Sequence, residues 1–205
     1  EIAALSAWAR SGTVKGDPAD APEPLNFDDS IKWKAGEPDL VVILPEITKL
    51  AGTADWWGEL ETVPTGMTED RYIKSVEVVE VNDVDMTQLS GTVGGRYIFH
   101  HMLWFTGKLD SEGNPQRSLF NAPWPVHEVG RNADIFDANT GRLLEAGSAI
   151  VSDSIHLHSN GRDTTGHLEI GFTFHDRDFE PKYRDSINFT GNGVDISIAP
   201  NQTDQ

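Results

Sequence analysis

Cysteine is absent from the 205 residues of this sequence. Disulfide bonds, thiolate metal sites and cysteine nucleophiles are therefore excluded, and a metal site must use histidine, methionine, carboxylate or backbone ligands. Long hydrophobic runs are absent too. The longest are LVVIL at residues 40–44 and YIFHHMLWF at residues 97–105, and both are too short to cross a bilayer. The sequence thus predicts a chain with no transmembrane segment of its own.

Positive charge is scarce as well. The chain has 16 lysine and arginine residues against 33 aspartate and glutamate residues, which gives a net charge of −17. Such a chain repels phosphate backbones, so nucleic acid is excluded as a partner. The negative charge instead favours cations, or a cationic protein surface, as the binding partner.

What the sequence does contain is a series of short, β-branched and apolar segments separated by turn residues. This pattern predicts an all-β fold, and we expect an antiparallel, jelly-roll-like β-sandwich. The predicted strands lie at residues 39–46, 59–66, 72–81, 96–105, 146–158, 167–175 and 187–199.

The ends of the chain differ from this central region. Residues 1–12 carry apolar side chains at helical spacing and a glycine placed as a C-cap, which predicts a short helix at residues 2–10. Residues 13–37 are rich in glycine, proline and aspartate without periodicity, and predict an extended linker. The sandwich is then expected to span residues 38–198, with a tail at 199–205.

All seven histidines lie between positions 100 and 175. His156 and His158 are two residues apart, so on one strand they share a face, about 6.5–7 Å apart. If residues 159–166 form the loop of a hairpin, His158 lies opposite His167 and His156 lies opposite Glu169. One face of that hairpin is then polar, and the other is a core face of Ile155, Leu157, Leu168 and Ile170. The alternative interpretation is a polar, solvent-facing sheet surface.

The adjacent pair His100 and His101 stands inside an apolar strand. Neighbouring residues on a regular strand point to opposite faces, so both imidazoles can reach one metal ion only where the strand bulges or ends. Binding through Nδ1 of one ring and Nε2 of the other would also help. The alternative is one core histidine and one surface histidine. His127 follows two prolines and is expected in a loop.

Four segments together resemble a known family. They are KWKAGEPDLVVILPE, VPTGMTEDRYIKSVEV, FHHMLWF and LLEAGSAIVSDSIHLHSNGRDTTGHLEIGFTF. Their order resembles bacterial members of the copper type II, ascorbate-dependent monooxygenases, relatives of the peptidylglycine and dopamine hydroxylating enzymes. The resemblance covers about residues 1–176, and the most specific parts are the histidine pair and the IHLHSNGR segment. The opening helix and GDPADAPEP resemble the segment that follows a cytochrome c domain in bacterial members, although no C-x-x-C-H haem motif is present.

The resemblance implies a copper site in the N-terminal domain of a two-domain enzyme. Its ligands would be His100, His101 and His156, with His158 and His167 as further candidates from the strand-face argument. In that family this copper supplies electrons, and the other domain activates oxygen and binds substrate. Because this sequence ends where the first domain should end, we expect no hydroxylation by the chain alone.

Three hypotheses follow. The first is a periplasmic or extracellular copper-binding, electron-transfer domain that is not catalytic alone and meets a protein partner. The second is an accessory or scaffold subunit of a larger membrane-bound redox assembly, respiratory or photosynthetic, with a vestigial metal site. The third is a zinc hydrolase built on the same histidines, with Glu128 or Glu169 as the base.

Overall fold

The computed structural model describes residues 1–23, 31–85, 95–116 and 123–184. The strand predicted at residues 187–199 and the tail at 199–205 lie outside these residues. The chain divides into two compact units, residues 1–31 and residues 32–205, which are described separately below.

The first unit contains the predicted helix. Helix α1 spans Ile2–Arg10, and Gly12 follows it with a φ of 90°. A short 3-10 helix, η1, spans Pro18–Asp20, and the Asp17 side chain accepts a hydrogen bond from the Ala19 N–H. No residue of α1 is buried within its unit. In the part of the chain that the structure describes, no helix is long and apolar enough to cross a membrane.

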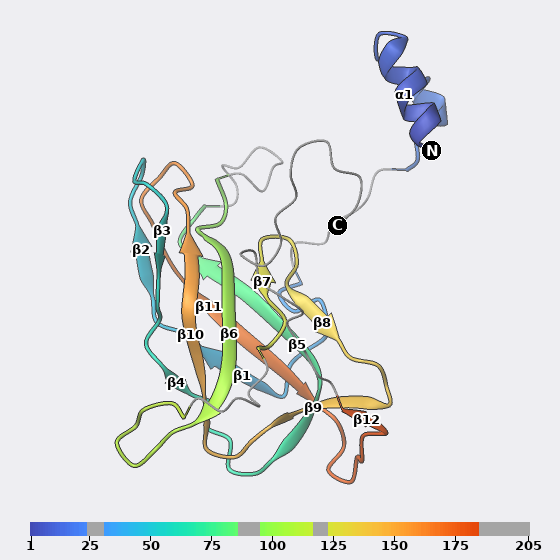
Figure 1. The fold of residues 1–205 in the computed structure, drawn as a ribbon. Helices are drawn as coiled ribbons and strands as arrows, with labels where there is room; N and C mark the ends of the chain where they lie inside the picture. Colours follow the sequence, from blue (N-terminus) through green and yellow to red (C-terminus); the bar gives the residue numbers. More distant parts are fainter. Residues whose placement is uncertain (24–30, 86–94, 117–122, 185–205) are drawn as a thin grey trace, which may run out of the picture. The chain divides into compact units, whose positions relative to one another are not determined.

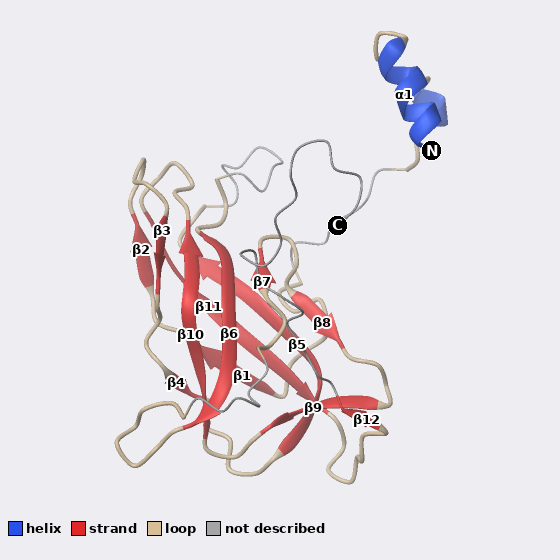
Figure 2. Cartoon of the chain, viewed as in Figure 1, coloured by secondary structure: helices blue, strands red, loops and turns tan. Residues whose placement is uncertain are grey.

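The second unit is a sandwich of two mainly antiparallel β-sheets, which confirms the predicted fold class (Figures 1 and 2). Among the described residues, the larger sheet has the order β1-β11-β5-β9-β12, with β2 beside β11 and β8 beside β5. The smaller sheet has the order β3-β10-β6-β7, with β4 beside β10. The strand bounds are β1 Leu40–Ile43, β2 Ile47–Lys49, β3 Trp56–Gly58, β4 Val63–Pro64, β5 Arg71–Asn82, β6 Phe99–Lys108, β7 His127–Glu128, β8 Ala133–Ile135, β9 Thr140–Leu144, β10 Ser148–Leu157, β11 Thr164–Phe174 and β12 Tyr183–Arg184.

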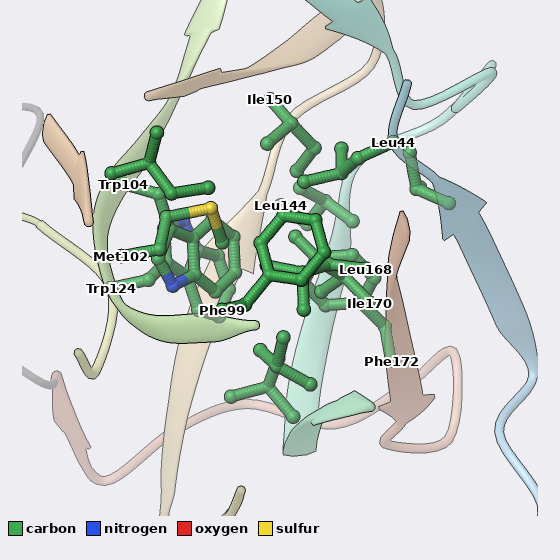
Figure 3. Close-up of a cluster of buried hydrophobic side chains, with 14 of the residues drawn as sticks. Leu44, Phe99, Met102, Trp104, Trp124, Leu144, Ile150, Leu168, Ile170 and Phe172 are labelled. Carbon is green, nitrogen blue, oxygen red and sulfur yellow. The ribbon is translucent and has the colours of Figure 1, made fainter. Parts of the chain in front are cut away.

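The core lies between the two sheets, where the inward side chains of β6 and β10 meet those of β5 and β11 (Figure 3). Trp104 and Trp124 stack with their ring centroids 5.3 Å apart, and Phe172 packs against both rings edge to face. In the middle of β6, Met102 and Trp104 are buried and Leu103 and Phe105 are half-buried, which is the alternation that the pleat of a half-buried strand requires.

The segment just before β1 belongs to the sandwich, although the linker prediction included it. Trp33 is buried, and its ring lies so close to Gly171 that a Cβ there would come within 2.7 Å of it. The buried carboxylate of Glu77 accepts hydrogen bonds from the Lys34 and Ala35 N–H groups, at 2.9 and 2.8 Å. These contacts tie the residues that follow Ile31 to β5.

The predicted hairpin between residues 158 and 167 is wrong. Strand β10 pairs with β3, β4 and β6, whereas β11 pairs with β1, β2 and β5, so the two strands lie in different sheets. The connection between them therefore crosses from one sheet to the other and does not turn back within one. The predicted core residues are nevertheless confirmed, because Ile155, Leu157, Leu168 and Ile170 are all buried, facing one another across the sandwich.

Candidate metal site

A β-bulge in β6 brings His100 and His101 to one face of the smaller sheet. His101 pairs with His156 on β10, but the next pair is Phe99 with Leu157, so His100 is the extra residue. Phe99 and Met102 are fully buried, while His100 is exposed and His101 half-buried. The bulge thus resolves the conflict between adjacent histidines and a regular pleat.

The bulge is held from both sides. Before it, the Ile98 and Phe99 N–H groups donate to the Glu80 carboxylate of β5, at 2.9 and 3.0 Å. At the bulge itself, the His100 carbonyl accepts a hydrogen bond from the Val129 N–H, at 3.0 Å. Backbone groups that the irregular pairing releases therefore have partners, as buried backbone groups require.

The three histidines that the family resemblance implies come together. His100 Nδ1 lies 2.9 Å from His101 Nδ1 and 3.2 Å from His156 Nδ1. One ring nitrogen from each residue lies within 4.8 Å of the other two. The two close contacts both involve Nδ1 of each ring, so the predicted mixture of Nδ1 and Nε2 within the adjacent pair is not what this geometry presents.

His156 is fixed on two further sides by residues of the segment 55–57. Its Nε2 lies 2.9 Å from Asp55 Oδ2, and because a carboxylate only accepts hydrogen bonds, Nε2 carries the proton. In the neutral form of this ring, Nδ1 is then the nitrogen with the lone pair. The Trp57 indole stacks on the His156 ring at a centroid distance of 4.1 Å and an interplanar angle of 5°. The same indole meets His101 edge to face at 4.8 Å.

The surroundings of His101 favour its neutral imidazole. Burial lowers the pKa of His101, and the neighbouring His156 and His100 lower it further. The hydrogen bond from His156 lowers the pKa of the Asp55 carboxyl group, which keeps that group ionised. A neutral imidazole is the form that binds metal ions, so the lowered pKa of His101 favours cation binding by that residue.

The further candidates His158 and His167 do not join the cluster. The His158 ring lies edge to face against His100 at 5.2 Å, but its Nε2 donates to the Tyr97 carbonyl at 2.9 Å. His167 is on β11 in the other sheet, where its Nε2 lies 3.5 Å from Glu169 Oε1. Glu169 also binds Lys32 at 2.6 Å. Because it belongs to the opposite sheet, Glu169 is not placed to act as a base at this site.

His127 is a second departure from expectation. It lies in β7 rather than a loop, it pairs with Met102, and it is buried. Its neighbour Glu128 pairs with His101 and is exposed on the outer face. Two prolines before the segment suggested a loop, but both precede β7 and so take no donor from its pairing with β6.

Asp55 and Trp57 are the functional candidates that sequence reasoning missed. Both precede His156 by about a hundred residues in the chain, and no motif marks them. The one available signal is a pair of adjacent tryptophans, TADWWGE, in a stretch that is otherwise polar. The structure shows both indoles exposed, and of the two only Trp57 is found stacked on His156 among the described residues.

The donor set fits a first-row transition metal. An imidazole nitrogen lies about 2.0–2.1 Å from bound zinc, so two such nitrogens are about 2.9 Å apart at a right angle and about 3.4 Å apart at a tetrahedral angle. The separations of 2.9 and 3.2 Å fall in this range. His100 Nδ1 is the central atom of the cluster, because it makes the close contact with Nδ1 of each of the other two rings. Comparison of the chain with protein-family models, with curated proteins and with solved structures finds no match.

Proposed function

We propose that the sandwich is a copper-binding, electron-transfer domain whose ligands are His100, His101 and His156. The observation that carries the proposal is the convergence of three Nδ1 atoms on the outer face of the smaller sheet, through the bulge at His100. Three neutral imidazoles suit both Cu(I) and Cu(II). A bound copper ion would supply one-electron chemistry at this face.

The protein's own residues make the site rigid and accessible. His156 is held by Asp55 and Trp57, and the bulge is held by Glu80 and Val129. His100 is exposed, so a partner can approach the cluster from solvent. When the ligands of a site are held in place, they move little as the charge of the bound ion changes, and this favours electron transfer.

The wider setting belongs to the same proposal. The net charge of −17 supports a protein partner with a cationic surface. The family resemblance supports a periplasmic or extracellular location, and it supports a role that depends on a second copper domain for any hydroxylation. The alternative is an accessory or scaffold subunit of a membrane-bound redox assembly in which the histidines no longer bind metal.

Copper titration of the purified protein tests the proposal. The signals are d–d absorption and the paramagnetic resonance of Cu(II), with elemental analysis of the protein as isolated. The decisive variants are His156→Ala and His158→Ala, which lie two residues apart but differ in their nitrogen contacts. Because loss of an outer-shell partner alone costs about 10–100-fold in affinity, loss of a ligand should cost at least about that much. His158→Ala should change affinity far less.

Three results would contradict the proposal. Equal losses in both variants would make His158 a ligand too. No copper binding by the unmodified protein would favour the scaffold alternative, with the histidines as remnants of a lost site. Ascorbate-dependent hydroxylation by the purified chain, free of partners, would show that the catalytic copper sits in this domain.

A further inference from the structure

We propose that Asp55 and Trp57 are positioning residues that select the Nε2–H tautomer of His156 and fix its ring plane. The cluster would then always present the His156 Nδ1 lone pair. This inference rests on the proposed metal site for its purpose, but the tautomer and the ring plane are properties of the metal-free protein.

The first step is the tautomer. A neutral imidazole carries one proton, and the nitrogen that keeps it is set by its hydrogen-bond partner. Asp55 Oδ2 lies 2.9 Å from His156 Nε2. This contact favours Nε2–H, whereas the opposite tautomer would leave two lone pairs facing each other there and would place a proton on Nδ1, toward His100.

The second step is the ring plane. The Trp57 indole and the His156 imidazole are almost parallel, at 5°, with centroids 4.1 Å apart. Trp57 and His156 are direct cross-strand partners between β3 and β10. A bulky ring on one face of the imidazole prevents rotation that would turn Nδ1 away from His100. Trp57 is 57% exposed, so burial of its own surface does not account for its position.

The third step is that hydrogen bonds hold the segment before Asp55 in place. The loop before it is bound to the loop after His158, because the Ala51 N–H donates to Asp163 and the Gly52 N–H donates to Ser159, at 2.8 and 3.0 Å. Next to Asp55, the Ala54 carbonyl accepts a hydrogen bond from the ammonium group of Lys49. Lys49 is only 6% exposed, which is unusual for a lysine and indicates a structural function for this contact.

The experiment combines two readouts on the intact chain. Nitrogen-15 chemical shifts of the His156 ring, measured without metal at alkaline pH, report which nitrogen carries the proton. Copper titration reports the affinity. The variants are Asp55→Ala, which removes the acceptor, and Asp55→Asn, which keeps an oxygen of the same size. Glu59→Ala is the matched control, because Glu59 is an exposed carboxylate four residues away on the same edge segment.

For Asp55→Ala we expect the Nδ1–H tautomer of His156 to become populated and copper affinity to fall by about 10–100-fold. Asp55→Asn should restore part of both, and Glu59→Ala should change neither. Trp57→Leu should lower affinity by about two- to tenfold, the usual worth of an aromatic pair, and Trp57→Phe should lower it less.

An unchanged tautomer in Asp55→Ala would overturn the assignment of Asp55, whether or not copper binds. Equal affinity losses in Asp55→Ala and Glu59→Ala would overturn it as well, since they would trace the effect to net charge. Equal affinity in Trp57→Leu and the unmodified protein would overturn the assignment of Trp57. A protein that shows the Asp55-dependent tautomer but no copper binding would keep this inference and contradict the proposed function.

Discussion

Two neighbouring cross-strand pairs of the smaller sheet place histidines in opposite environments. His101 pairs with Glu128 on the outer face, and Met102 pairs with His127 on the inner face. The outer histidine joins two other imidazoles that solvent can reach. The inner one is 4% exposed, and neither of its ring nitrogens has a hydrogen-bond partner among the described residues. The side of the pleat, more than the residue type, therefore determines what each imidazole can do.

The inner environment keeps its histidine neutral. Burial lowers the pKa of His127 to about 4, and the nearby Phe99 backbone opposes this shift only in part. A cavity of about 10 Å³ touches His127 and Asn132, and the Asn132 side-chain oxygen is also without a partner. That volume holds about one water molecule, which is too little for a ligand. The buried histidine is thus a structural feature, whereas the outer cluster is open to a ligand.

The largest expected effect is the pH dependence that His127 confers on stability. The unfolded chain binds the His127 proton near pH 6.5, and the folded chain binds it only near pH 4. The contribution of His127 to the free energy of unfolding is therefore fully present above pH 6.5. It falls as the pH drops through this range, by about 1.4 kcal/mol per pH unit and about 3 kcal/mol in total. Urea unfolding of the protein and of His127→Gln from pH 7 to pH 4 measures it, and parallel curves would refute the prediction.

Substitution of His100, the extra residue of the bulge, should change copper affinity and leave the free energy of unfolding almost unchanged. His100→Ala deletes an exposed imidazole, so its free energy of unfolding without metal should stay within about 0.5 kcal/mol of the unmodified protein. Its copper affinity should fall by at least about 10–100-fold. His127→Gln is the matched control, and should lose little affinity. A similar affinity loss in both variants would mean that the two faces are not independent.

Glu80 joins the two environments, because it binds the backbone just before the bulge and also lines the cavity. Burial is the largest cause that raises its pKa, and the hydrogen bonds from Ile98, Phe99 and Asn82 oppose the shift. The unfolded chain loses this proton first as the pH rises, so Glu80 destabilises the fold increasingly from about pH 4.5 up to its raised pKa. Glu80→Gln lacks this penalty.

We therefore expect the stability of Glu80→Gln, relative to the unmodified protein, to improve as the pH rises from 4 to 7. At the acid end, the loss of one backbone hydrogen bond should leave the variant about 0.5–1.5 kcal/mol less stable. Urea unfolding at several pH values measures the difference. A relative stability that falls with rising pH would contradict the prediction.

The smallest effect distinguishes the tryptophans of the two faces. Trp57 is exposed and stacked on His156, whereas Trp104 and Trp124 are 1% exposed in the core. Cu(II) quenches nearby indoles, so binding should remove the long-wavelength part of the emission and shift the remainder to the blue. Trp57→Phe should abolish most of this change. Trp56→Phe is the control, since that indole folds over Gly58; if it abolished the change equally, Trp57 would not be the reporter.

Much of the fold was predictable because it depends on local periodicity. The β-branched segment 72–81 and the apolar run 96–105 correspond to β5 and β6, and the helical spacing near the N-terminus corresponds to α1. The core residues Ile155, Leu157, Leu168 and Ile170 were assigned correctly although their predicted hairpin was wrong. The face that a side chain takes follows from the pleat of its own strand, whichever strand it pairs with.

The sequence by itself determined the chemistry available at the site. Without cysteine, a transition-metal site here had no thiolate ligand available, and the adjacent histidines in an apolar strand made imidazole the first candidate. Tertiary structure alone decided the rest: the bulge that turns His100 outward, the placement of β10 and β11 in different sheets, and the approach of Asp55 and Trp57 to His156. These features arise from pairing between strands far apart in the chain, and strand register is set by long-range packing that local periodicity does not encode.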